Sequence, residues 1–300
     1  MSSPLRLALF AGALVLVFAA SAVAGGAIGP EPTTEPGAPA HADGEAAHAG
    51  DELPGEHAAT GGGSHGATAQ SVRGLASAAD GLRLVVEDPQ LRRGRAERLA
   101  FRVVDDRGDT VRHFDVGHTK RMHLIVARRD LTGFQHLHPE QRADGAWETS
   151  ATLGEAGSYR LFADFSRGGE PQTLASDLRV DGRADLRSLP APASAVVSDG
   201  GYDVELASSG AGPGEEAELR FTISRDGRPV ATEPYLGAGG HLVALREGDL
   251  AFLHVHPTEE AGGNEIGFAA TFPTEGRYRL FLQFQHDGEI QTVAFTQEVR

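Results

Sequence analysis

The residues best suited to chemistry are histidines, and they occur in a spaced set that the chain contains twice. In each set a His begins an apolar run, and an H-x-H pair begins thirteen positions later within Phe-x-His-x-His-Pro. Residues i and i+2 of a strand share a face about 6.5–7 Å apart, so each H-x-H pair projects two imidazoles together. Imidazole nitrogens suit Cu(II) and Zn(II). The two predicted ligand sets are His123, His136 and His138, and His241, His254 and His256.

Each set has a further polar neighbour on a later strand of its own repeat. Asp164 is a candidate fourth ligand for the first set, or an acceptor for an imidazole N–H. The aligned position of the second repeat is Gln283, a weaker ligand, with His286 just beyond it. Met122 points to the opposite side of its strand from His123, so a Met-rich Cu(I) site is not expected. We therefore expect two paired metal sites, of which the first is the stronger.

The same histidines also fit a site without metal. His241 shares a strand face with Val243 and Leu245, so its set would lie at the rim of a core, where a hydrogen-bonded His network fits equally well. A third interpretation is a metal-dependent hydrolase or oxidase, because three His with an open position form a catalytic arrangement. Only Asp164 offers a positioned base, so we expect no enzyme.

Composition limits the classes of partner. The chain has 300 residues, with 27 Lys and Arg against 42 Asp and Glu, and a formal charge of −15. Nucleic-acid binding needs a basic patch, so no nucleic-acid partner is expected. The chain has no Cys, which excludes disulfides, thiolate metal sites and the Cys ligand of a blue-copper centre.

The N-terminus has the pattern of an export signal. Met1–Arg6 is short and carries one positive charge, an apolar run follows over Leu7–Ala24, and Ala22–Ala24 has the small-x-small form of a cleavage site. The run is also close to bilayer-spanning length, so an uncleaved anchor is the alternative for residues 1–26. Both alternatives place the rest of the chain outside the cytoplasm, with the membrane contacted only through this segment.

The stretch at residues 27–80 is rich in Ala, Gly, Pro and acidic residues and has almost no large apolar side chains, so we expect a disordered linker. Its histidines are suited to loose capture of divalent metal, although a plain solubilising spacer is the commoner explanation. They are His41, His48, His57 and His65. In the loop before His123, His113 and His118 are expected to be surface residues.

Short apolar runs separated by Gly and Asp turns fill the rest of the chain. They occupy residues 81–181, and the same order returns in residues 201–300 after an Ala-, Ser- and Pro-rich linker at 182–200. This pattern predicts an all-β fold of two tandem Ig-like antiparallel β-sandwich domains. The strands predicted for the first domain are Leu82–Val86, Leu99–Val104, His123–Ala127, Gly133–His138, Trp147–Leu153, Gly157–Phe165 and Thr173–Val180.

Two motifs carry a resemblance to a known group of proteins. Met122–Pro139 reads Met-His-Leu-Ile-Val-x-Arg-x-Asp-Leu-x-x-Phe-x-His-x-His-Pro, and Glu233–Val243 reads Glu-Pro-Tyr-Leu-Gly-Ala-x-Gly-His-Leu-Val. In these motifs the chain resembles exported actinobacterial Ig-like proteins, similar to the YtkA-like and CopC-like sandwiches associated with heavy-metal and copper handling. The resemblance covers roughly residues 80–300 and implies metal handling. The chain lacks the N-terminal His and Met-rich ligands of CopC proteins, so their copper ligands do not carry over.

These observations predict an extracytoplasmic protein that buffers, senses or delivers Cu(II) or Zn(II). Its expected partners are a divalent metal ion and, as a candidate, a membrane metal transporter. The competing hypothesis is a tandem Ig-like surface module whose His networks serve only the fold. Convergence of the imidazoles in space distinguishes the two, because geometry rather than spacing defines a metal site.

Overall fold

The computed structural model describes residues 72–210, 212–253, 255–258 and 263–300. The expected export segment at 1–26 and most of the expected linker at 27–80 lie outside the described residues. The described residues all belong to one unit of the chain, Ser64–Arg300. They form strands and turns, and none of them is part of a helix that could cross a bilayer.

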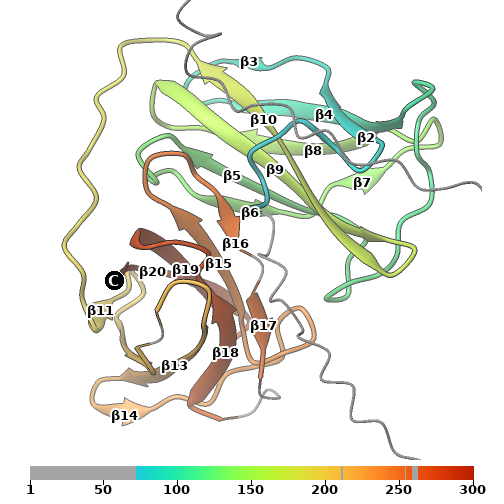
Figure 1. The fold of residues 1–300 in the computed structure, drawn as a ribbon. Coiled ribbons are helices and arrows are strands. Elements are labelled where there is room, and N and C mark those ends of the chain that lie inside the picture. The colour runs from blue at the N-terminus through green and yellow to red at the C-terminus, as the bar shows by residue number, and fades with distance from the viewer. Residues whose placement is uncertain (1–71, 211, 254, 259–262) are drawn as a thin grey trace, which may run out of the picture. The chain divides into compact units, whose positions relative to one another are not determined.

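The first repeat folds into two sheets of five strands each (Figure 1, blue to yellow-green). All neighbouring strands are antiparallel except β3 and β10, which pair in parallel. The first sheet has the order β1 (Ala78–Ala79), β2 (Leu82–Val86), β4 (Ala96–Asp105), β8 (Trp147–Thr152) and β7 (Glu140–Gln141). The second has the order β3 (Gln90–Leu91), β10 (Glu170–Val180), β9 (Gly157–Arg167), β5 (His123–Arg128) and β6 (Gln135–Leu137).

The second repeat has the same plan (Figure 1, yellow to red). Its first sheet has the order β11 (Ala195–Val197), β12 (Tyr202–Ser208), β13 (Glu216–Arg225), β18 (Glu265–Thr271) and β17 (Val255–Pro257), and β14 (Arg228–Pro229) pairs with β13. Its second sheet has the order β16 (Phe252–Leu253), β15 (His241–Arg246), β19 (Gly276–His286) and β20 (Glu289–Val299).

The predicted all-β fold of two duplicated domains is confirmed. The seven strands predicted for the first domain all form, with ends shifted by at most three residues. The structure adds short strands where the sequence indicates linker, β1 within 27–80 and β11 within 182–200. Both strands pair along the edge of a longer strand, so tertiary pairing overrides weak local propensity there.

The segment that carries the H-x-H pair changes sheets in both repeats, but at different points. In the first repeat it stays paired with β5 through Leu137, which lies opposite Leu124, and His136 lies opposite Ile125. In the second repeat Val255, at the position equivalent to Leu137, already pairs with Ala270 of the other sheet. The duplicated sequence motif therefore has two different local structures.

Apolar side chains fill a core inside each sandwich and a third cluster between the repeats. Strand β5 is buried along its whole length, because one face packs into its own sandwich and the other into this third cluster. In the third cluster Ile125 and Phe162 of the first repeat meet Val243 of the second, and Phe134 stacks on Phe281 with ring centroids 4.1 Å apart. This packing brings the first residues of β5 and β15, both His, close to one another.

Candidate metal centre

Strand starts and strand pairing position the histidines. His123 is the first residue of β5 and lies opposite Asp164 of β9. His241 is the first residue of β15 and lies opposite Gln283 of β19. His136 comes from the middle of β6. Because β5 and β15 are equivalent strands of the two repeats, the duplication brings two copies of one His position to the same place.

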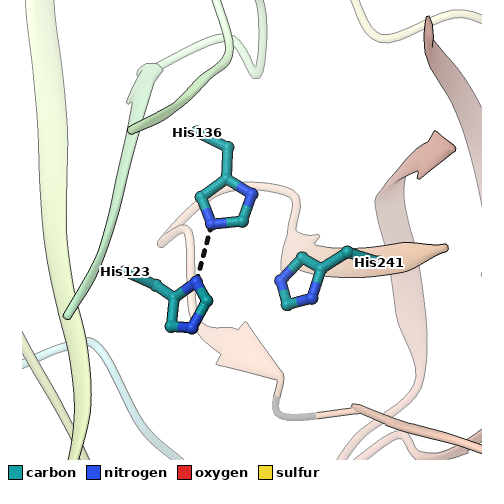
Figure 2. Close-up of side chains that lie close together, drawn as sticks. All are labelled: His123, His136 and His241. Atoms are coloured by element: carbon teal, nitrogen blue, oxygen red, sulfur yellow. Dashed lines mark hydrogen bonds between the residues drawn. The ribbon is translucent and has the colours of Figure 1, made fainter. Parts of the chain in front are cut away.

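Three imidazoles from the two repeats converge (Figure 2). His123, His136 and His241 each offer one nitrogen, and these three atoms lie within 4.8 Å of one another. The ring of His241 stacks on that of His123 at 5.5 Å between centroids and lies 4.7 Å from that of His136. Among the described residues this is the one group of three or more potential ligands with such spacing. We call it the His trio.

Two hydrogen bonds fix the tautomers of His123 and His136. Nε2 of His123 lies 3.1 Å from the carbonyl oxygen of Gly117, which can only accept, so Nε2 carries a proton. Nδ1 of His136 lies 2.7 Å from Oε1 of Gln283, whose amide nitrogen donates to Thr292, so Nδ1 of His136 carries a proton. Both protons sit on the ring atoms that point away from the trio.

The remaining nitrogens face one another. Nδ1 of His123 and Nε2 of His136 are 3.0 Å apart, the contact drawn in Figure 2. With the outer nitrogens protonated and both rings neutral, each of these atoms presents a lone pair to the other. Two facing lone pairs repel, so this geometry calls for a cation between them, either a shared proton or a metal ion. Hydrogen bonds to the outer ring nitrogens are also the usual way in which proteins orient metal-binding His.

Burial keeps the rings of His136 and His241 in the neutral form, which is the form that binds metal. Desolvation, reinforced by His123 and His138, lowers the pKa of His136 to about 3, against the opposing effect of its bond to Gln283. The pKa of His241 is well below its usual value, first because of burial and then because of His136 and His123. Protons therefore compete weakly for these nitrogens at neutral pH.

His138 lies beside the His trio, at the outer end of the first set. Its ring centroid is 4.7 Å from that of His136 and 5.2 Å from that of His123. Burial, then His123 and Lys120, lower its pKa to about 4. Its Nε2 atom is buried and makes no hydrogen bond with any described residue. The nearness of His123, His136 and His138 expected from the sequence is thus present in the structure.

Asp164 lies behind His123 rather than within the group of converging ligand atoms. Its Oδ1 accepts a hydrogen bond of 2.7 Å from the hydroxyl of Thr173. Burial raises the pKa of Asp164, and the Thr173 bond together with positive charge at His123 and Arg73 opposes the rise. This carboxylate can balance positive charge that develops on the His123 ring.

The second predicted set differs from the expectation, because His241 lies with His123 and His136 of the first set. His256 is exposed and lies on β17, opposite Ala269. His254 is outside the described residues. The physical reason is the earlier change of sheet in the second repeat, which removes β17 from the edge of β15. Of the second predicted set, the described residues place only His241 in the converging group.

Sequence reasoning missed two contributors to the site. Gln283 was expected to back the second set, yet it bonds to His136 of the other repeat. His118, expected on the surface, is half-buried, and its ring lies 5.7 Å from that of His241. His118 also lines a cavity of about 240 Å³ together with His123, Asp164 and His256. The only signal for His118 was its place five positions before His123.

Three solved structures with some likeness to the chain are bacterial proteins. The Escherichia coli adhesin FdeC is 14% identical with a TM-score of 0.26, over 74% of this chain and 65% of that chain. Salmonella alpha-2-macroglobulin is 13% identical with a TM-score of 0.27, over 77% of this chain and 15% of that chain. A putative membrane anchored protein from Corynebacterium diphtheriae is 8% identical with a TM-score of 0.23, over 74% of this chain and 57% of that chain. These TM-scores are too low to support an inference about function.

The comparison with family models gives a clearer result than the comparison with solved structures. No curated protein matches the chain. The family described as a domain of unknown function, DUF8832, matches it twice, over residues 77–182 and 195–300. The two matches cover most of the chain and correspond to the two β-sandwiches. The chain therefore belongs to the DUF8832 family, of which it carries two tandem copies.

Proposed function

We propose that this protein binds one divalent transition-metal ion, Cu(II) or Zn(II), at the His trio between its two repeats, and that it does so outside the cytoplasm. The observation that carries the proposal is the 3.0 Å approach of Nδ1 of His123 to Nε2 of His136, with ligand nitrogens of His123, His136 and His241 all within 4.8 Å of one another. The proposal gives the ion a binding role rather than a catalytic one.

The donor set favours these two ions. Three neutral imidazoles with no Cys in the chain suit Cu(II) or Zn(II) rather than a thiolate-bound metal. Bonds of about 2.0–2.1 Å at a tetrahedral angle place two nitrogens roughly 3.3 Å apart. The observed separation of 3.0 Å between His123 and His136 needs only a small opening to reach that value.

Buffering, sensing or delivery are the roles that such a site supports. The N-terminal pattern of an export signal or anchor is the support for an extracytoplasmic location, and a membrane metal transporter is the corresponding candidate recipient. The motif resemblance to YtkA-like and CopC-like sandwiches points the same way. An ion held by both repeats would also link them mechanically, which suits a protein that responds to metal.

The test is a metal titration of the full chain against matched variants. His136→Ala should remove one high-affinity equivalent of Cu(II) or Zn(II) measured by competition with a chelator, because it deletes one of three ligands. His113→Ala is the control, since His113 is exposed and lies outside the trio. Equal stoichiometry and affinity for wild type and His136→Ala contradict the proposal.

The alternative is a structural module in which a shared proton takes the place of the metal. The position of Asp164 opposite His123 favours it, because a buried carboxylate stabilises an imidazolium ring. Under this alternative His136→Ala lowers the melting temperature by the same amount with and without added Zn(II). A stabilisation by Zn(II) that the variant lacks contradicts it.

A further inference from the structure

His138 lies between the His trio and a second, outer cavity of about 570 Å³. This outer cavity is lined by His138 together with charged and hydroxyl side chains of β4, β7 and β8 and their neighbours, namely Arg98, Glu140, Arg142, Glu148, Thr149 and Ser150. On its inner side the same ring approaches His136 at 4.7 Å and His123 at 5.2 Å between centroids. One imidazole thus borders both the outer cavity and the trio.

The buried nitrogen of this ring has no partner among the described residues. Nε2 of His138 has essentially no accessible surface and makes no hydrogen bond with them. A buried polar atom left unpaired costs about 1–3 kcal/mol, so such atoms usually serve a ligand or a reaction. Nε2 is withdrawn from solvent, and the residue that carries it lines the outer cavity.

Other groups in the outer cavity are less suited to take an ion. The carboxylate of Glu148 accepts from Arg142 at 2.7 Å and lies 2.9 Å from Arg98, so two guanidinium groups already neutralise it. Glu140 is exposed to solvent. His138 is the one nitrogen donor of this cavity that also contacts the rings of the trio.

We propose that His138 is the loading ligand of the centre: it takes a hydrated divalent ion from the outer cavity and passes it inward to His123, His136 and His241. The inference rests on the proposed metal-binding function. The step is ligand exchange without redox change. Water leaves the ion as an imidazole nitrogen of His138 binds, and the bond to His138 breaks as the nitrogens of the trio replace it.

The first test measures the rate of Cu(II) binding by stopped-flow quenching of Trp147, the single tryptophan of the chain, which lies on β8 beside the outer cavity. His138→Ala should lower the second-order rate constant by on the order of tenfold, because the loading step is lost. The dissociation constant of this variant for Cu(II) should change by a smaller factor, because the His trio remains. The melting temperature of the metal-free variant checks that it folds.

An unchanged rate constant in His138→Ala overturns the inference. A dissociation constant raised as much as in His136→Ala also overturns it, because His138 would then be a permanent ligand. Absence of any Cu(II) or Zn(II) site in the wild-type chain overturns the proposed function itself. Failure of the loading role and failure of the metal-binding function are distinguishable, because only failure of the metal-binding function removes binding from the wild-type chain.

A second variant tests the route without touching a histidine. Ser150→Phe places a bulky ring in the outer cavity and should slow Cu(II) binding while leaving the affinity close to that of wild type. Thr152→Phe is the matched control, because Thr152 is exposed on the same face of β8 but does not line this cavity. Equal rates in the two variants contradict the route through the outer cavity.

Discussion

At the scale of single residues, the centre depends on which ring nitrogen carries a proton. Gly117 and Gln283 accept from the outer nitrogens of His123 and His136, so the inner nitrogens are left as lone pairs. Gln283 does this from the other repeat, and its own amide is held by Thr292. Gln283, which looks like a poor metal ligand in the sequence, therefore orients the imidazole of His136.

Gln283→Leu should weaken metal binding without removing any ligand. Loss of a hydrogen bond to the outer nitrogen of a metal-binding His typically lowers metal affinity by about 10–100-fold, because the ring orientation and tautomer are no longer fixed. Gln283→Glu keeps an acceptor at the same place and should retain most of the affinity. Gln285→Leu, two residues along the same strand, is the control. Competitive titration with Zn(II) measures all three, and equal affinities across the series contradict the prediction.

At the scale of elements, the β5–β6 hairpin holds His136 against His123. Arg128, at the end of β5, is fully buried and donates to Asp130 in the turn at 2.9 and 2.6 Å. Its other donors reach the carbonyls of Ala156 and Asp185, so the same guanidinium also fixes the segment between the repeats. The equivalent pair in the second repeat, Arg246 and Asp249, is more exposed.

Asp130→Ala should therefore destabilise the protein more than Asp249→Ala does. Removing one partner of a buried ion pair costs about 3–5 kcal/mol, because the remaining charge stays buried and unpaired. The side chain of Asp249 is 42% exposed, so water can solvate Arg246 after the substitution and the loss should be smaller. Urea unfolding of the two variants measures the difference. Equal losses of unfolding free energy in the two variants contradict the prediction that burial of the ion pair sets the cost.

At the scale of the whole molecule, the His trio needs both repeats. His123 and His136 belong to the first and His241 to the second, and the apolar cluster around Ile125 and Val243 brings the strand starts together. Duplication alone supplies two copies of a His set. Packing of the two β-sandwiches against each other then places His241 of the second set beside His123 and His136 of the first. Within the described residues the result is one converging group of histidines that spans the two repeats.

Zn(II) should accordingly stabilise the full chain in a way that depends on the second repeat. At a free concentration of 100 times the dissociation constant, the gain in unfolding free energy is about 2.7 kcal/mol. His241→Ala should abolish most of this gain, although the other two ligands lie in the first repeat. His113→Ala should retain it. Calorimetric melting with and without Zn(II) measures this stabilisation. A full gain in the His241→Ala variant contradicts the prediction.

The sequence by itself determined the strands and the duplication. Strand pattern and turn chemistry are local properties, so the runs at Leu82–Val86 and Gly157–Phe165 could be assigned without a structure. The tertiary structure decided how the histidines group. His241 joins His123 and His136 because two sheet faces pack together, whereas His256, on a segment that changes sheets earlier, lines the neighbouring cavity. Both outcomes depend on contacts between residues far apart in the chain, which spacing along the sequence does not encode.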